Sequence, residues 1–284
     1  MRWDFGRRSQ NVEDRRGRGG MGGTVIGGGI GTILLAIVVT LLGGDPSVIL
    51  QQAASGGSGR QTDVTSPEAE RQVEFTKVVL ADTEDVWSEV FREEGIPYRK
   101  PTLVLFSGRD QSACGTADRA AGPFYCPLDE KVYLDLSFFR DLATEMQAPG
   151  DFAQAYVVAH EVGHHVQKQL GILDKVHGLQ SRVSKTQSNQ LSVRLELQAD
   201  CFAGVWANRS QDRQNNLVLE QGDLEEGLRA ASSVGDDRLQ MQAQGYVVPE
   251  SFNHGSSEQR MRWFRQGVKT GDPGQCDTFN ASKL

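Results

Sequence analysis

The residues best suited to chemistry lie at positions 160 to 164, which read His-Glu-Val-Gly-His. On a helix, residues four apart share a face, so His160 and His164 can present two imidazoles to one ion. Glu161 lies about 100° further round the helix, where it can reach a water on the metal without binding the metal. Because neutral imidazole suits Zn²⁺, the spacing predicts a catalytic zinc site with Glu161 as general base. A helix with two surface histidines is the alternative.

A catalytic zinc site needs a third protein ligand, and Glu196 is the strongest candidate. Glu196 and Asp200 are four residues apart, so both carboxylates share one face of a second helix. Glu196 can then bind the metal while Asp200 accepts the outward N–H of a ligand histidine. The neighbours of this pair are apolar, which disfavours an acidic pair on a solvated face. Asp174 remains an alternative ligand, and His177 is interpreted as a loop histidine.

The helix that carries the histidines has clear end signals. Asp151 can cap its start, with Gln154 completing a capping box, and Gly171 follows its expected end at residue 170. The helix that carries Glu196 covers about residues 190–208. Further helices are expected from Ser66 to Gly95, from Asp223 with Glu226, and from Ser256 with Gln259.

Two or three strands lie between the helix that ends near Gly95 and the helix that carries the histidines. Thr102–Phe106 is a short β-favouring run, and Phe124–Cys126 and Val132–Leu134 flank a hairpin connection. We therefore predict an α+β, zincin-like fold with a small antiparallel sheet packed on the zinc-bearing helices. Residues 131–136 could form the edge strand that binds an extended peptide, and a fully paired strand is the alternative.

Residues 24–42 form an uncharged apolar run that matches the ~30 Å hydrocarbon core as a helix. The arginines before it predict that residues 1–23 lie in the cytoplasm. A flexible Gly- and Ser-rich linker, residues 43–66, would then lead to a folded domain, residues 67–284, outside. A cleaved signal peptide is the alternative. Three glycines could allow helix pairing and a homodimer: Gly23, Gly27 and Gly31.

The four cysteines lack CxxC spacing, which disfavours a thiolate zinc site. In an outward-facing domain two disulfides are expected, with three possible connectivities. We favour a short loop between Cys114 and Cys126, which leaves Cys201 to tie a helix to the carboxy-terminal tail at Cys276. Four free buried thiols are the alternative.

The charge balance limits the partners. The formal net charge is -7, and no stretch after the amino terminus forms a basic stripe able to neutralise phosphates. Nucleic-acid binding is therefore not expected.

Several segments together resemble one known family. They are HEVGHHVQ at 160–167, ELQADCFAGVWA at 196–207, MRW at the start, NVEDRRG at 11–17, the CG…GPFYCP…VYLD segment, and HGSSEQR at 254–260. This combination resembles the neutral zinc metallopeptidase family of bacteria, over nearly the whole chain. The resemblance implies a membrane-tethered peptidase but does not supply a particular substrate. We expect one zinc ion per chain, a protein or peptide substrate, and a location in the bacterial cytoplasmic membrane.

The resemblance also supplies a role for a histidine downstream of the third ligand. Thermolysin-like enzymes share the HExxH and ExxAD arrangement, and His254 lies on a short loop before the helix that begins at Ser256. We expect His254 to stabilise the oxyanion of the tetrahedral intermediate. A helix-entry role for His254 is the alternative. The rival function is an extracytoplasmic binding or scaffold protein that keeps zinc for stability.

Overall fold

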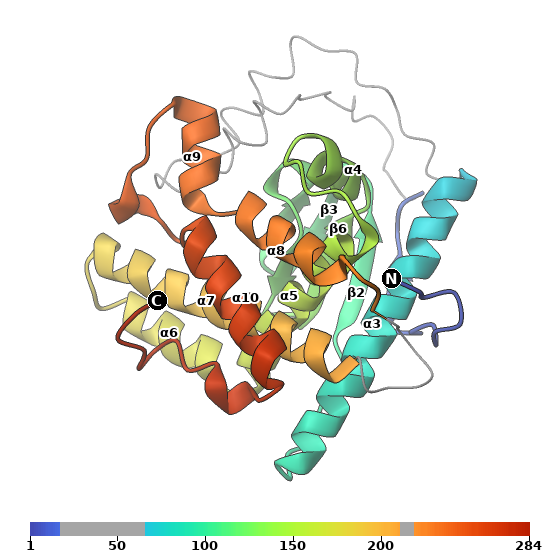
Figure 1. Cartoon of the computed structure of the whole chain (residues 1–284), viewed down its shortest axis with the longest axis horizontal. Coiled ribbons are helices and arrows are strands. Elements are labelled where there is room, and N and C mark those ends of the chain that lie inside the picture. The colour runs from blue at the N-terminus through green and yellow to red at the C-terminus, as the bar shows by residue number, and fades with distance from the viewer. Residues whose placement is uncertain (18–65, 211–218) are drawn as a thin grey trace.

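The structure, a computed structural model, describes residues 1–17, 66–210 and 219–284, which form an α+β fold (Figure 1). Across these three ranges no helix is both long enough and apolar enough to span a bilayer. The predicted membrane helix at 24–42 lies outside the described residues, as do Gly23, Gly27 and Gly31 and nearly all of the predicted linker.

The four-stranded sheet is mixed rather than antiparallel. Its strand order is β1-β2-β6-β5, with β1 and β6 parallel to β2 and only β5 antiparallel to β6. The strands expected from the sequence are present. The chain runs through β5 before β6, and β6 lies between β2 and β5 in the sheet. This insertion makes β6 run in the direction of β2. The strands are β1 (Val12–Asp14), β2 (Thr102–Phe106), β5 (Phe124–Cys126) and β6 (Lys131–Asp135), and a separate hairpin holds β3 (Arg109–Ser112) and β4 (Gly115–Asp118).

The strand predicted as an open edge is an interior strand. β6 pairs with β2 on one side and with β5 on the other. Within the described part of the chain, β5 has β6 as its only strand partner, so β5 forms an edge of the sheet. A peptide that adds to this end of the sheet would therefore meet β5 and not β6.

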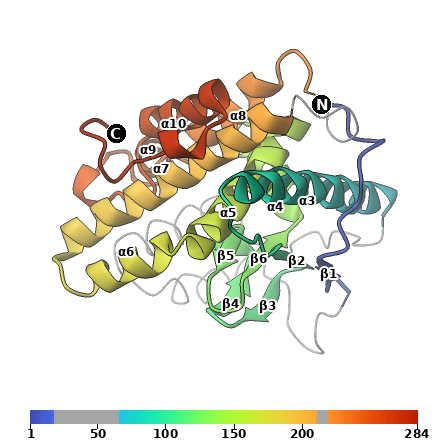
Figure 2. The same ribbon diagram turned by 90° about the horizontal axis from the view of Figure 1, so that it is seen from below.

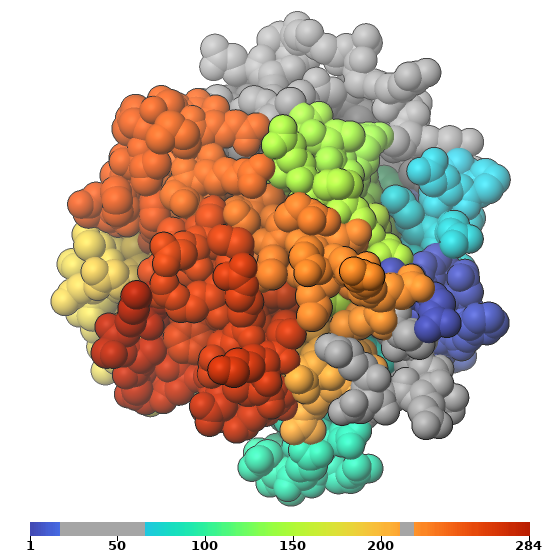
Figure 3. Space-filling view, viewed as in Figure 1, coloured from blue at the N-terminus to red at the C-terminus, as the bar shows by residue number. Residues whose placement is uncertain are grey.

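The helices stack on the sheet in layers. Helices α3 and α5 lie next to the strands, and α7 and α10 lie beyond α5 (Figure 2). The elements α8 to α10 cover much of one face of the molecule, beside α4 (Figure 3). The bounds are α3 (Pro67–Glu93), α4 (Ser137–Thr144), α5 (Asp151–Gln169), α6 (Ile172–Gln180), α7 (Lys185–Ser210), α8 (Asp223–Ser233), α9 (Asp236–Gln244) and α10 (Ser257–Thr270).

Two of the predicted helix starts form as expected. Ser66 accepts a hydrogen bond from the backbone N–H of Ala69 and opens α3. Ser256 and Gln259 form the complete capping box that opens α10. These reciprocal bonds satisfy backbone donors that a helix leaves unpaired, so they fix where each helix begins.

The predicted cap of α5 is wrong. Gly150 is the N-cap residue, and the backbone N–H of Phe152 donates to the carboxylate of Glu226 at 3.1 Å. Asp151 instead contacts the α-amino group of Met1 at 3.0 Å. Glu226 of α8 thus supplies the capping carboxylate that was expected from Asp151, because Asp151 pairs with the amino group of Met1.

Residues 1–17 belong to the same folded unit as the rest of the described chain. β1 pairs with β2, and the ring of Trp3 packs on Phe75 with centroids 5.4 Å apart. Arg16 forms an ion pair with Glu70 at 2.7 Å. A single membrane crossing at 24–42 would place residues 1–17 and 66–284 on opposite sides, where strands cannot pair. The predicted topology, with an inside amino terminus and an outside domain, therefore conflicts with this sheet.

Helices α7 and α10 approach closely because glycines lie at their contact. A Cβ at Gly204 would lie 2.2 Å from the carbonyl oxygen of Phe264, and one at Gly267 would lie 1.9 Å from that of Cys201. Both distances are far below van der Waals contact. Any larger residue here would push the two backbones apart.

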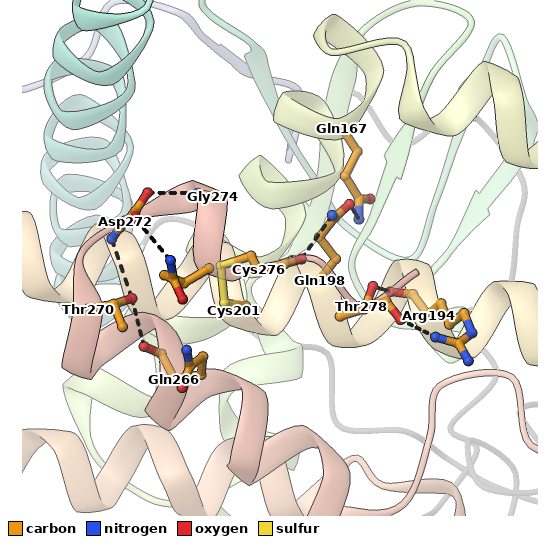
Figure 4. Close-up of a disulfide and its surroundings, with 11 residues drawn as sticks. Gln167, Arg194, Gln198, Cys201, Gln266, Thr270, Asp272, Gly274, Cys276 and Thr278 are labelled. Carbon is orange, nitrogen blue, oxygen red and sulfur yellow. Dashed lines mark hydrogen bonds between the residues drawn. A yellow bond between two sulfur atoms is a disulfide. The ribbon is translucent and has the colours of Figure 1, made fainter. Parts of the chain in front are cut away.

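Both predicted disulfides are confirmed. Cys114 bonds to Cys126 and ties the β3–β4 hairpin to β5. Cys201 on α7 bonds to Cys276 in the carboxy-terminal segment (Figure 4). Beside this second bridge, the side chain of Gln198 donates to the carbonyl of Cys276 at 3.0 Å. The tail is thereby fixed to the helix that carries Glu196.

Candidate metal centre

The structure brings together the three residues predicted to bind a metal. One ligand atom from each of His160, His164 and Glu196 lies within 4.8 Å of the others. His160 Nε2 is 3.1 Å from one oxygen of Glu196, and His164 Nε2 is 3.4 Å from the other. Helices α5 and α7 can approach this closely because Gly163 faces Ala199, where an added Cβ would be 3.1 Å from Cα.

Each of the two histidines has its second ring nitrogen held by a partner. His160 Nδ1 donates to Asp200 at 2.9 Å, so Asp200 lies where the sequence analysis expected it. His164 Nδ1 donates to the side-chain oxygen of Gln167 at 2.8 Å. The amide of Gln167 in turn donates to the carbonyl of Leu195 at 2.7 Å. Partners of this kind orient a ligand ring and leave Nε2 available to the metal.

A buried arginine that the sequence analysis missed lies behind His160. Arg260 on α10 donates from Nε and Nη2 to the two oxygens of Asp200, at 2.8 and 2.9 Å. The hydroxyl of Tyr156 also donates to Asp200. Asp200 is fully buried, so these three donors compensate the cost of removing its charge from water.

The electrostatics of the site favour a bound cation. Burial alone would lower the pKa of His160, but Asp200 and Glu196 outweigh it and raise the pKa to about 10. The nearby histidines hold the pKa of Glu196 well below its usual range despite burial. His160 Nε2 and the carboxylate of Glu196 thus face each other at 3.1 Å, in the place where a cation would be shared.

The charges and donor types both suit zinc. Glu161, Glu196 and Asp200 carry three formal negative charges, and Arg260 carries one positive charge. A divalent ion would balance the difference. Two imidazoles and one carboxylate are a ligand set typical of catalytic zinc sites, and they leave a coordination position for water. The residues present therefore fit Zn²⁺.

A cleft of about 800 Å³ opens in front of the three ligand side chains. Glu161 lines it, and its side chain lies on the same helix as both histidines. Phe124 and Tyr125 of β5 line another wall, and His254 reaches the cleft from the loop before α10. The general-base candidate, the edge strand and the oxyanion candidate thus face one space.

His254 is held by an aspartate that the sequence analysis did not identify. Its Nδ1 donates to Asp236 at 3.1 Å. The other oxygen of Asp236 accepts the backbone N–H groups of Asn253, His254 and Gly255 at 2.7 to 3.0 Å. Burial opposes protonation, but Asp236 raises the pKa of His254 above its usual value. Asp236 therefore favours the doubly protonated ring, the form in which Nε2 can also donate a hydrogen bond.

The remaining candidates lie apart from the ligand group. Asp174 forms an ion pair with Lys168 at 2.7 Å on the surface. His177 belongs to α6 rather than to a loop, and it lines the cleft. His165 is buried away from the metal ligands, where Nδ1 contacts the hydroxyl of Tyr125 at 3.0 Å and links α5 to β5.

The fold and the site define a class of α+β proteins in which one helix supplies two histidines and a second helix supplies a carboxylate. The chain belongs to the family described as "putative neutral zinc metallopeptidase", whose sequence model matches residues 1–279. It is 50% identical to "Uncharacterized protein YpfJ" of Escherichia coli K12 over 292 residues, which covers 99% of this chain and all of that protein.

Mycobacterial relatives are more distant. The chain is 40% identical over 261 residues to "Uncharacterized protein Mb2605" of Mycobacterium bovis and to "Uncharacterized protein Rv2575" of Mycobacterium tuberculosis. The alignments cover 86% of this chain and 86% of each relative. No solved structure shows a significant match to the chain.

Proposed function

We propose that the chain is a zinc-dependent endopeptidase that hydrolyses peptide bonds in protein or peptide substrates. The observation that carries this proposal is Glu161, a carboxylate that lines the cleft beside a group of three ligands. A structural zinc site is usually closed by four protein ligands and has no need of such a carboxylate. Three ligands with a neighbouring base are the arrangement that hydrolysis requires.

The side chains of the cleft have separate roles in the proposed reaction. His160, His164 and Glu196 would hold Zn²⁺, which would act as a Lewis acid that lowers the pKa of water and polarises the scissile carbonyl. Glu161 accepts a proton from the attacking water and passes it to the leaving amine nitrogen. His254, with Nδ1 on Asp236, donates its other N–H to the developing oxyanion.

The edge strand β5 offers a place for the substrate backbone. Phe124 and Tyr125 line the cleft, and the outer edge of β5 is not paired by another described strand. An extended peptide can add to such an edge through backbone hydrogen bonds, with alternate side chains entering the cleft. This mode replaces the one expected for residues 131–136.

The proposal is tested by replacing Glu161 with Gln in the full chain and measuring hydrolysis of an unstructured protein. Loss of the base should lower kcat by about 10² to 10⁴-fold while zinc content stays at one per chain. Glu68→Gln is the matched control, because Glu68 is exposed at the start of α3. A wild-type protein that binds zinc but hydrolyses nothing would support the rival, a zinc-stabilised scaffold.

Membrane attachment through residues 24–42 remains a proposal that rests on the sequence. The two disulfides favour an oxidising compartment for the described residues. Because residues 1–17 pack on the rest of the described chain, the proposed attachment cannot be a single crossing, and we propose that both ranges lie on the same, outward side of the cytoplasmic membrane. Pairing of two copies through Gly23, Gly27 and Gly31 likewise stays a proposal.

A further inference from the structure

We propose that Arg260 is a positioning residue for the metal site: it holds the carboxylate of Asp200 so that Asp200 can orient the ligand His160. The inference rests on the metal-binding part of the proposed function and is independent of peptidase activity. Arg260 also lines the cleft, but its closest contacts are with Asp200. It acts through Asp200.

The contacts fix the carboxylate in two directions. Arg260 binds both oxygens of Asp200 through two different nitrogens, at 2.8 and 2.9 Å. A two-point contact of this kind sets the plane of the carboxylate as well as its position. One of the same oxygens accepts the Nδ1–H of His160 at 2.9 Å. The direction in which His160 presents Nε2 therefore depends on the guanidinium.

The same guanidinium reaches groups on both zinc-bearing helices. Its Nη2 donates to the hydroxyl of Tyr156 on α5 at 3.2 Å. That nitrogen also lies 4.0 Å from the metal-facing carboxylate of Glu196 on α7. The Arg260 side chain is only 4% exposed, so water cannot replace it as a partner for Asp200. Lysine, a single point charge, cannot reproduce the planar fork.

The position of Arg260 is set by α10 as a whole. The capping box fixes the start of α10 four residues before Arg260. Glycine contacts at Gly204 and Gly267 then let α10 approach α7 closely enough for the guanidinium to reach Asp200. The loop that carries His254 enters the same helix. Helix α10 and the loop that enters it thus place Arg260 next to Asp200, and His254 at the cleft.

The test compares zinc binding by the full-length wild type, Arg260→Lys and Arg265→Lys. Arg265 is exposed on the same helix, so its replacement is the matched control. Competition with a chelator should show an affinity about 10- to 100-fold weaker for Arg260→Lys and unchanged for Arg265→Lys. The absorption spectrum of the Co²⁺-substituted protein should change in Arg260→Lys alone, because it reports ligand geometry. Wild-type affinity and spectrum in Arg260→Lys would overturn the inference.

A double-mutant cycle separates a positioning role from a general loss of structure. If Arg260 acts through Asp200, the variant Asp200→Asn with Arg260→Lys should bind zinc about as weakly as Asp200→Asn alone. Independent, additive losses would contradict the inference, and this comparison holds even if each variant also lowers thermal stability. A wild-type protein that binds no zinc would instead refute the proposed function.

Discussion

Replacing Gly267 with Ala should push α10 away from α7 and weaken the zinc site from a distance. The added Cβ would lie 1.9 Å from the carbonyl oxygen of Cys201, about 1.5 Å short of the 3.4 Å at which ordinary contact begins. The obstacle is backbone, so no rotamer change can relieve it. A shift of that size would carry the Arg260–Asp200 bonds, now 2.8 and 2.9 Å, beyond hydrogen-bonding distance.

The stability cost follows from two opposing terms. Overpacking costs up to about 3 kcal/mol, and replacing glycine with alanine inside a helix returns about 1 kcal/mol. A net loss of about 2 kcal/mol should lower Tm by about 4 to 8 °C in a domain of this size. Gly178→Ala is the control, because its Cβ would meet nothing within 4 Å in α6.

Calorimetry of the metal-free proteins and chelator competition for zinc are the assays. Gly178→Ala should raise Tm slightly and leave zinc affinity unchanged. Gly267→Ala should lower both Tm and zinc affinity. If Gly267→Ala raised Tm as Gly178→Ala does, the close contact between α7 and α10 would not exist as described, and the account of how Arg260 reaches Asp200 would be wrong.

Three further predictions concern the cleft, the amino-terminal segment and the topology. His254→Ala should lower kcat by about 10²-fold or more with zinc content unchanged, as steady-state kinetics and metal analysis can show. Hydrogen bonds from basic partners hold the pKa values of Glu13 and Asp14 below their usual range. The stability that these two carboxylates contribute to the fold is complete above the ordinary carboxyl pKa of about 4. It is lost as pH falls through their lower pKa values in the folded state, so hydrogen exchange at β1 should increase more than at β6 near pH 3. Cysteines placed at exposed Phe5 and Met241 should both be labelled by an impermeant reagent on spheroplasts, because both are proposed to lie outside the cytoplasmic membrane. Labelling of only one of them would contradict this topology.

Local patterns in the sequence predicted the parts of the site that lie within single helices. Helical periodicity places His160 and His164 on one face of α5, and Glu196 and Asp200 on one face of α7. In the structure these two faces lie opposite each other. Capping chemistry located the starts of α3 and α10, and the hairpin before β6 followed from its turn residues. Such features depend on neighbours a few residues away, which the sequence displays directly.

Features that depend on tertiary partners were missed. β1 is only three residues long, has no readable periodicity, and pairs with a strand some 90 residues further along. Asp151 has the sequence context of a helix cap, but its carboxylate forms an ion pair with the amino group of Met1 instead. Arg260 and Asp236 meet their partners across elements, so no local pattern marks either one. The parallel pairing of β2 with β6 depends on the path of the intervening chain.

Zinc binding by the two histidines of α5 and Glu196 can be tested by anomalous diffraction at the zinc edge, with crystals of the protein purified without chelator. We expect a single strong peak between the side chains of His160, His164 and Glu196, with about 2.0 to 2.2 Å to each ligand atom. A peak at the other acidic group, formed by Asp151, Asp223 and Glu226, with none at the histidines would contradict it.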